Sequence, residues 1–365
     1  MYVKSVKFEN FRNLAEDIFY PDKGVNVIYG DNAQGKTNLT EAIWLFTGQK
    51  SFRGTRDFQL VNKQNPNKSA ELFAKFFSAG REQSAQIKIE NKRSAVLNES
   101  AVSSPSKLSE SFHAVVFSPA DMQLIDDGPA IRRRFFDNAI SILRPKYGKI
   151  ITAYNRAVQQ RNVLLKDVQY HSELSFMLDA FEDHIAKYGE YIISQRKKYL
   201  AAITENLPEI YGGLSDNREQ IAITYKASGF DNEDDLTADK LREAIMNNRK
   251  EDIKTAVTSI GPHRDDFDIF INGDSVKVYG SQGQKRSSII ALKLCEAEIL
   301  KRLRGERPIM ILDDVMSELD RSRQNYILNH IKDWQVFITC CDPETVENLK
   351  SGSCFHIQNG AISAE

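Results

Sequence analysis

Residues 30–37 read Gly-Asp-Asn-Ala-Gln-Gly-Lys-Thr, which places two glycines, a lysine and a hydroxyl residue at the spacing of a phosphate-binding loop. Gly30 and Gly35 let successive backbone N–H groups turn inward around an anion, and a following helix adds the positive end of its dipole. An apolar segment at 24–29 precedes the loop, and residues 37–47 are apolar at helical spacing. The chain must therefore contain a strand, the loop and a helix in that order.

This loop predicts a site for a nucleoside triphosphate. Lys36 is expected to meet the outer phosphates as a surface charge without core contacts, and Thr37 to bind Mg²⁺. The residues predicted to surround the nucleotide are Gly30, Asp31, Asn32, Ala33, Gln34, Gly35, Lys36 and Thr37.

Composition limits the remaining possibilities. The 365 residues carry a net charge of -1, so any nucleic-acid site has to be a local patch. The four cysteines lack the spacing of a zinc site and fit a reducing compartment. The N-terminus does not resemble a signal peptide, and no apolar run approaches the ~20 residues that span a membrane. We therefore expect a cytoplasmic protein without a membrane partner.

The pattern along the chain predicts a split α/β domain. Strand patterns occupy residues 1–118, beginning with a hairpin over 2–20, and strands resume after 205. Between them, helical periodicity predicts two long helices that pack antiparallel as an arm. The predicted organisation is a head domain of mixed sheets with helices, formed by 1–118 and 205–365, interrupted by a helical arm at 119–204. Whether the arm has a role or merely pads the fold is left open.

Two acidic residues follow an apolar strand near the C-terminus. Residues 309–314 end in Asp313 and Asp314, which could hold Mg²⁺ and orient or deprotonate an attacking water, respectively. A hydrophobic run that ends in two aspartates is common, so alone it indicates only a strand end. Beside a phosphate loop, it predicts the rest of a nucleotide site.

The tetrapeptide Ser281-Gln282-Gly283-Gln284 precedes a predicted helix over 287–303. Its hydroxyl and backbone amides would suit a γ-phosphate at a helix N-terminus. The alternative is a plain serine cap with a turn glycine.

In this order, the phosphate loop, the SQGQ segment, the acidic strand, the loop Ser317–Asp320 and a final strand at 335–339 resemble the head of ABC and SMC-type ATPases. Within that superfamily the chain resembles the RecF family of bacterial recombination-repair proteins. The similar segments are GDNAQGKTNLTEAI, GPAIRRRFFDNAI, YNRAVQQRNVLLK, GPHRDDF, GSQGQKRSSIIALKLCEAEI and ILDDVMSELD.

The resemblance implies an ATP-dependent, Mg²⁺-dependent homodimer in which SQGQ of one subunit caps the nucleotide of the other. It assigns catalytic roles to Asp314, Lys36 and Ser281 and adds Asp320 to the nucleotide site. It also implies a weak, DNA-stimulated ATPase that binds single-stranded, gapped or duplex DNA near the nucleoid. Such a protein would cooperate with RecR and RecO in loading RecA.

Several positions depart from the wider ATPase pattern. Asp314 stands where a glutamate is usual, which suits slow hydrolysis, and Thr339-Cys340-Cys341-Asp342 replaces the segment of the switch histidine. Gln123 is a candidate for the magnesium-sensing glutamine. Arg12 occupies the place of a phosphate-contacting arginine, although a simple surface-turn arginine is an equal alternative.

Basic residues in the arm are the candidates for DNA contact. Arg132, Arg133 and Arg134 form a run of three consecutive cations, and Arg196, Lys197 and Lys198 form another on the second helix. Charge alone favours a solvated helix face, whereas the resemblance favours DNA.

Two other protein classes compete with this prediction. The nucleotide-binding subunit of an ABC transporter would have a short helical segment where this chain has a long arm. A structural SMC-type tether would need far longer heptad-patterned helices.

Overall fold

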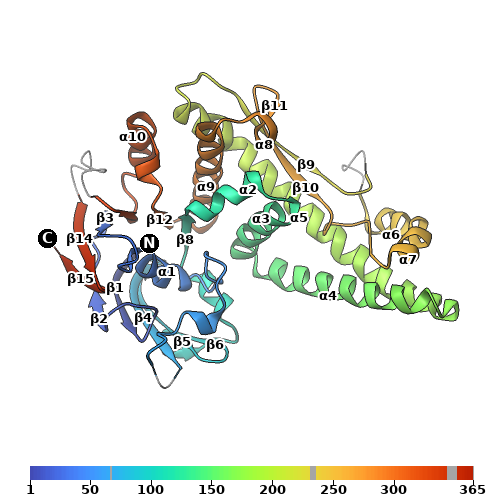
Figure 1. The fold of residues 1–365 in the computed structure, drawn as a ribbon, viewed down its shortest axis with the longest axis horizontal. Helices are drawn as coiled ribbons and strands as arrows, with labels where there is room; N and C mark the ends of the chain where they lie inside the picture. The colour runs from blue at the N-terminus through green and yellow to red at the C-terminus, as the bar shows by residue number, and fades with distance from the viewer. Residues whose placement is uncertain (66–67, 231–235, 343–351, 365) are drawn as a thin grey trace. The chain divides into compact units, whose positions relative to one another are not determined.

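The structure is a computed structural model in which residues 1–65, 68–230, 236–342 and 352–364 are described. The chain forms two compact units (Figure 1). Unit 1 comprises residues 1–122, 209–219 and 286–365, and unit 2 comprises residues 123–208 and 220–285.

A mostly parallel sheet organises unit 1. Over the described residues it has six strands, in the order β15-β14-β3-β13-β12-β8, and only β15 runs antiparallel to its neighbour. Every residue of β8, β12 and β13 is buried, as expected for strands that are covered on both faces. The strands are β3 (Val25–Tyr29), β8 (Ala114–Phe117), β12 (Ile309–Asp313), β13 (Val336–Cys340), β14 (Gly352–Gln358) and β15 (Ala361–Ala364).

The register of this sheet brings the predicted site together. Asp313 pairs with Thr339, and Thr339 pairs with Ile28 near the end of β3. Because parallel strands end at the same edge, the loop after β3 and the acidic residues at the end of β12 lie on one edge of the sheet.

A second, antiparallel sheet completes the strands of unit 1. Its described strands follow the order β2-β1-β4-β5-β6-β7, which confirms both the N-terminal hairpin and the predicted antiparallel strands. Alternate residues of β4 and β5 are buried, so one face of this sheet packs on the core. The strands are β1 (Tyr2–Glu9), β2 (Asp17–Phe19), β4 (Ala70–Ser78), β5 (Arg81–Ile89), β6 (Arg93–Leu97) and β7 (Ser100–Ala101).

Helices connect the strands of unit 1. The phosphate-loop helix α1 is buried along most of its length, including Leu39, Ile43 and Leu45. The helices and 3-10 turns are α1 (Lys36–Leu45), η1 (Asp57–Gln59), η2 (Pro105–Glu110), η3 (Pro119–Met122), η5 (Met316–Glu318) and α10 (Arg321–His330). The long helix α9 (Gln282–Arg304) begins in unit 2 and continues in unit 1.

Unit 2 contains the predicted helical arm and a small sheet. Arg161 on α4 pairs with Glu182 on α5, whereas Lys146 lies over the ring of Tyr191, so the two helices run antiparallel as predicted. The helices and 3-10 turn are α2 (Gln123–Asp126), α3 (Pro129–Leu143), α4 (Pro145–Val168), η4 (Ser172–Met177), α5 (Leu178–Leu214), α6 (Ala238–Asn247), α7 (Arg249–Thr255) and α8 (Val276–Tyr279). The three-stranded sheet described here is β11 (Asp274–Ser275), β10 (Asp266–Ile271) and β9 (Ile221–Lys226).

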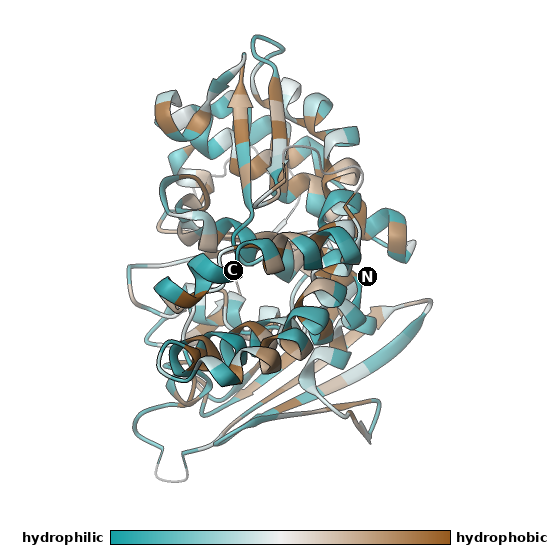
Figure 2. Ribbon diagram, turned by 90° about the vertical axis from the view of Figure 1, so that its right-hand side faces the viewer, coloured by the Kyte–Doolittle hydropathy of each residue, from teal (hydrophilic) through white to brown (hydrophobic). Residues whose placement is uncertain are grey.

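Hydropathy follows the periodicity of these elements. Figure 2 shows hydrophobic and hydrophilic bands alternating along the helices and strands. At one end of the α4–α5 pair, Leu164, Leu165, Val168 and Leu178 form a buried cluster. The helical stripes recognised in the sequence therefore mark the core of this unit.

Two features of the fold differ from those expected from the sequence. Residues 220–285 cluster with the helical unit, whereas the sequence assigned them to the head. In addition, the strand at 335–339 is not the final one, because β14 and β15 follow it. The polar, short β14–β15 hairpin has a weak strand signal, and its place in the sheet is set by pairing with β3.

Candidate functional site

The phosphate loop has the backbone that its glycines permit. Gly30 and Gly35 have φ angles of 146° and 124°, and Ala33 between them has a φ of 65°. A Cβ at Gly30 would lie 2.4 Å from the carbonyl oxygen of Ile357. Glycine is therefore required at Gly30 both by the positive φ and by the close approach of β14.

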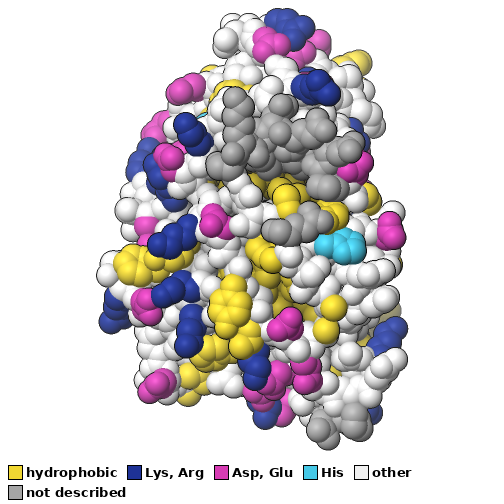
Figure 3. All heavy atoms as spheres, turned by 90° about the vertical axis from the view of Figure 1, so that its left-hand side faces the viewer, with side chains coloured by type: hydrophobic (Ala, Val, Ile, Leu, Met, Phe, Trp, Pro, Cys, Tyr) yellow, Lys and Arg dark blue, Asp and Glu magenta, His cyan; other side chains and the backbone are white. Residues whose placement is uncertain are grey.

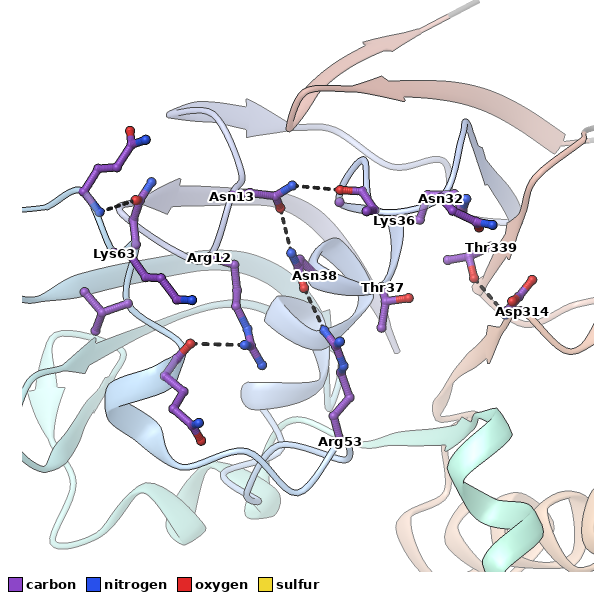
Figure 4. Close-up of a pocket in the computed structure, with 16 residues that line it drawn as sticks. Arg12, Asn13, Asn32, Lys36, Thr37, Asn38, Arg53, Lys63, Asp314 and Thr339 are labelled. Carbon is purple, nitrogen blue, oxygen red and sulfur yellow. Dashed lines mark hydrogen bonds between the residues drawn. The ribbon is translucent and has the colours of Figure 1, made fainter.

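A cavity of about 750 Å³ opens beside this loop (Figure 4). Of the described residues that line it, four are cations and one is a carboxylate, so the cavity suits a polyanion. Its predicted members are Arg12, Asn32, Ala33, Gly35, Lys36, Thr37 and Asp314. Its further members are Asn13, Asn38, Arg53, Gln59, Val61, Asn62, Lys63, Gln64 and Thr339.

Lys36 is buried at the loop rather than exposed. The residue is only 7% exposed. Its Nζ donates to the carbonyl oxygens of Gly30 at 2.5 Å and Asp31 at 3.0 Å. The Sγ of Cys341 lies 3.7 Å away. The expectation of a surface charge is therefore wrong: the ammonium is held at the loop by main-chain dipoles.

The two aspartates at the end of β12 have different surroundings: Asp313 is the last residue of the strand, and Asp314 follows it. Asp313 is 4% exposed, and its Oδ1 accepts a hydrogen bond from Thr339 Oγ1 at 2.9 Å. Burial raises the pKa of Asp313, and hydrogen bonds from Thr339 and Thr37 oppose that rise. Asp314 is exposed on the cavity wall, has a φ of 54°, and donates its N–H to Thr339 Oγ1 at 2.8 Å.

These contacts bring the proposed metal ligands together. The Thr37 hydroxyl lies near enough to Asp313 to oppose the rise in the pKa of that carboxyl group, so a hydroxyl and a carboxylate lie close together beside the loop. Mg²⁺ prefers such oxygen ligands and completes its shell with phosphates and water. The residues present therefore fit a magnesium ion brought by a nucleotide.

Thr339 is the residue of the replaced switch segment that contacts the acidic pair. Its single hydroxyl accepts from the backbone of Asp314 and donates to Asp313. In the sequence, Thr339 is distinguished only by its departure from a family pattern. Its function in the site follows from strand register, which a sequence motif does not contain.

Arg12 is an ion-pair residue as well as a member of the cavity wall. Its Nε and Nη2 donate to the two carboxylate oxygens of Glu41 at 2.9 and 3.1 Å, and Glu41 is fully buried. Further donation to Thr55 and Gln59 fixes the guanidinium. Arg12 is therefore more constrained than a simple surface-turn arginine.

The SQGQ segment forms the start of α9 in unit 2. Ser281 Oγ accepts from the N–H of Gln284 at 3.2 Å, and Gln284 Oε1 accepts from the N–H of Ser281 at 2.8 Å. This reciprocal pair is a capping box. Ser281 and Gln282 are exposed, Gly283 is half-buried, and all four residues belong to the helix start as predicted.

Asp320 caps the next helix. Its Oδ1 accepts from the N–H of Arg323 at 3.0 Å at the start of α10, and that hydrogen bond lowers the pKa of Asp320. Gln123, the glutamine candidate, is the exposed first residue of α2.

The arginine run assigned to DNA is mostly engaged within unit 2. Arg132 is 5% exposed and pairs with both carboxylate oxygens of Asp266, at 2.7 and 2.9 Å. Arg133 is half-buried and donates to the carbonyl oxygen of Asp265 at 2.7 Å. Only Arg134 of these three is exposed, so Arg132 is a structural ion-pair residue rather than a solvent-facing cation.

Sequence reasoning missed the cations Arg53 and Lys63 on the cavity wall. Both lie in the irregular segment after α1, where no periodic pattern or motif distinguishes a site residue from a surface residue. The basic, polar composition of that segment was the one available signal.

The fold and the phosphate-loop cavity define a P-loop ATPase head of the SMC type. The family described as RecF/RecN/SMC N terminal domain matches residues 2–363. An SMC head domain from Pyrococcus furiosus shares this fold, with a TM-score of 0.57 at 16% identity over 100% of this chain and 96% of that one.

Closer relatives narrow the family. The chain is 36% identical to the DNA replication and repair protein RecF of Clostridium perfringens, over 99% of each chain, and 38% identical to that of Clostridium kluyveri, over 100% of each. It is similar to two solved structures of the recombination mediator protein RecF in the RecFOR pathway. RecF-ATPrS has a TM-score of 0.91 at 35% identity, and RecF-ATP has 0.90 at 34%; each covers 100% of this chain and 98% or 97% of its own. The chain belongs to the RecF family.

Proposed function

We propose that this protein is an ATP-binding DNA-repair switch of the RecF type, with Mg·ATP in the cavity beside the phosphate loop. The observation that carries the proposal is the buried Lys36, which lies between loop carbonyl groups on a wall rich in cations. Lys36 meets the outer phosphates, and Arg12, Arg53 and Lys63 supply further positive charge. The solved RecF-ATP structure, similar over its full length, supports ATP as the nucleotide.

The acidic pair supplies the proposed metal site and hydrolysis. Thr37 and Asp313 would hold Mg²⁺, which neutralises charge on the phosphates when it is bound. Asp314 is exposed on the cavity wall, where its carboxylate orients or deprotonates an attacking water. Because aspartate reaches less far than glutamate, hydrolysis is slow and serves as a timer.

A second copy of the chain completes the site in this proposal. Its exposed Ser281 and the backbone amides of the α9 start would approach the γ-phosphate, with Gln282, Gly283, Gln284 and Asp320 around the nucleotide. The capping box keeps Ser281 at the helix start. Because each nucleotide would contact both copies, ATP binding and dimer formation would be coupled.

The proposed DNA contact uses the exposed cations of the helical unit. Arg134, Arg144, Lys149 and Arg156 are exposed, whereas Arg161 and Arg196 are buried. On the face drawn in Figure 3, cationic and anionic side chains are interspersed. We assign DNA in single-stranded, gapped or duplex form to the exposed cations, with weak stimulation of the ATPase.

Membership of the RecF family supports a proposed cellular role in DNA replication and repair. The relatives are named for DNA replication and repair, and the similar solved structures for the RecFOR pathway. We therefore propose action with RecR and RecO in loading RecA, near the nucleoid in the cytoplasm. In the described part of the chain, no helix has the length and apolarity needed to cross a membrane. Full-length similarity to RecF leaves no support for the transporter subunit.

Sedimentation tests this function. The protein is measured with and without Mg·ATP, and with and without a gapped duplex. The proposal predicts a monomer without nucleotide, a dimer with Mg·ATP, and a DNA complex that requires ATP. A sedimentation coefficient that ATP never changes, together with no ATP binding, would refute it.

A further inference from the structure

Two asparagine side chains connect the phosphate loop to Arg53. Asn13 Nδ2 donates to the carbonyl oxygens of Ala33 at 3.2 Å and Gln34 at 3.3 Å. Asn38 Nδ2 donates to Asn13 Oδ1 at 2.6 Å, and Arg53 donates through Nη1 to Asn38 Oδ1 at 3.0 Å. Figure 4 shows the two hydrogen bonds that join Asn13 to Asn38 and Asn38 to Arg53.

The donors and acceptors at its two ends fix the direction of every hydrogen bond in this series. A guanidinium has only donors, so the atom of Asn38 that faces Arg53 must be the oxygen. The Asn38 amide nitrogen is then left for Asn13, which must accept through Oδ1. Asn13 therefore turns its own nitrogen to the loop carbonyl groups, which can only accept. No amide in the series can flip without breaking a hydrogen bond.

This series of hydrogen bonds fixes the orientation of the part of the loop that would face phosphate. A peptide plane holds the carbonyl group of one residue and the N–H of the next in opposite directions. The Gln34 carbonyl oxygen accepts from Asn13 and, at 3.0 Å, from the N–H of Gly360, so the direction of the Gly35 N–H is fixed as well. Ala33, with its φ of 65°, is held by the same asparagine.

We propose that Asn13 and Asn38 are positioning residues that make Arg53 and the phosphate loop bind the triphosphate as one unit. The inference rests on the proposed function, because it takes the cavity to be the ATP site. Arg53, Asn13 and Asn38 all line that cavity. Ordering of one end by phosphate therefore orders the other end through the two amides.

Solvent exposure predicts when this coupling matters. Asn13 and Arg53 are exposed, so without a nucleotide water competes for their hydrogen bonds and the contacts contribute little to folding. A bound nucleotide excludes that water, and hydrogen bonds strengthen in the drier surroundings. The coupling is thus a property of the nucleotide complex.

A set of double-mutant cycles on the full chain tests the proposal, with Mg·ATP affinity measured by calorimetry. The changes Asn13→Ala and Arg53→Ala are made singly and together, first in protein that retains Asn38 and then in protein that carries Asn38→Ala. Each single change is expected to weaken binding about threefold to tenfold, the range of one lost hydrogen bond. With Asn38 present, the double variant should lose less than the product of the two losses.

With Asn38→Ala, the losses should simply multiply. Asn38→Asp is the sharper variant, because it keeps an acceptor for Arg53 but loses the donor to Asn13; it should also abolish the coupling. Thermal unfolding without nucleotide should be unchanged in all variants, a result that a merely structural role would not give.

Asn62→Ala is the matched control, because Asn62 lines the same cavity but accepts from the N–H of Gln64. It does not belong to the hydrogen-bonded series of Asn13, Asn38 and Arg53, which we call the relay. The loss of Mg·ATP affinity caused by Asn62→Ala should multiply with the loss caused by Arg53→Ala, whether Asn38 is retained or replaced. If the wild type does not bind Mg·ATP, the proposed function fails. If the wild type binds, but the effects of Asn13→Ala and Arg53→Ala multiply even with Asn38 present, the relay is refuted while the ATP site stands.

Discussion

Lys36 Nζ lies 2.5 Å from the carbonyl oxygen of Gly30, so the backbone of the loop itself holds the lysine side chain. Replacing this buried ammonium by methionine keeps the side-chain volume and removes the charge. We expect Lys36→Met to fold normally and to bind Mg·ATP about 10- to 100-fold more weakly, the range for hydrogen bonds to a charged group. Circular dichroism and calorimetry check the two parts, and unchanged affinity would contradict the assignment.

Ser281→Arg should separate nucleotide binding from dimer formation. The exposed hydroxyl at the α9 start is proposed to face the nucleotide of a second copy, and a bulky cation would prevent that approach. We expect the variant still to bind ATP at its own phosphate loop, while the ATP-dependent dimer and the part of the ATP affinity that dimer formation adds are lost. Sedimentation gives the dimer and calorimetry the affinity; a normal dimer would show that Ser281 does not face the partner.

A mixture of two variants tests whether the site is shared. Ser281→Arg and Lys36→Met subunits each lack one half of the proposed site, but a mixed dimer retains one complete site. We expect ATPase activity to return on mixing, to at most about half of the wild-type activity because one of two sites is intact. Continued absence of activity would argue against the arrangement between subunits.

The arginines of the helical unit should divide into structural and DNA-binding residues. Arg132→Ala leaves the partly buried Asp266 unpaired and should lower the free energy of unfolding by on the order of 3 kcal/mol. Arg134→Ala with Arg156→Ala should leave stability unchanged and reduce the slope of log affinity against log salt by about 0.9 per lost duplex contact. Urea unfolding and DNA titrations at several salt concentrations measure both. An unchanged slope would return Arg134 and Arg156 to a solvated face.

His263 should make the protein less stable at acid pH. Burial lowers the pKa of His263 to about 4, and its neutral ring bridges Tyr154 and the carbonyl oxygen of Thr258. An unfolded histidine has a pKa of about 6.5, so the unfolded state binds more protons between pH 4 and 6.5. The free energy of unfolding should therefore fall as pH drops through that window.

Urea midpoints at pH 7.5 and pH 5 measure this dependence. Burial also lowers the pKa of His113 to about 4, so His263→Gln should reduce the acid loss without removing it. An equal loss in wild type and His263→Gln would show that His263 does not contribute.

The parts of the fold that sequence could predict are those with local rules. The phosphate loop needs positive φ angles at Gly30 and Gly35, so its glycines are visible in the sequence. Buried strands such as β12 and helical stripes such as that of α4 also have local periodicity. The position of the acidic pair at the end of its strand could be predicted for the same reason.

The parts that sequence could not predict depend on partners far along the chain. Arg132 reads as a free cation until Asp266, 134 residues away, is placed beside it. From the sequence alone, Lys36 is predicted to be a surface charge, because its burial depends on how the loop folds around it. The place of Thr339 beside Asp313 depends on the pairing of β13 with β12. Arg53 belongs to the cavity through the same kind of long-range packing.

The central claim is that ATP joins two copies and that hydrolysis at Asp314 times their release from DNA. Asp314→Asn suits the test, because asparagine tolerates the φ of 54° and keeps the N–H that Thr339 accepts. Hydrolysis should fall by about 10² to 10⁴, the range for a lost general base, while ATP still binds. Asp313→Asn, which disturbs the metal ligand, should instead weaken dimer formation.

The decisive measurement is the dissociation of protein from a gapped duplex after ATP is removed, compared among wild type, Asp314→Asn and Asp313→Asn. We predict that Asp314→Asn remains on the DNA far longer than wild type and that Asp313→Asn scarcely assembles. If Asp314→Asn hydrolyses ATP slowly but leaves the DNA as fast as wild type, hydrolysis does not time release and the switch is contradicted.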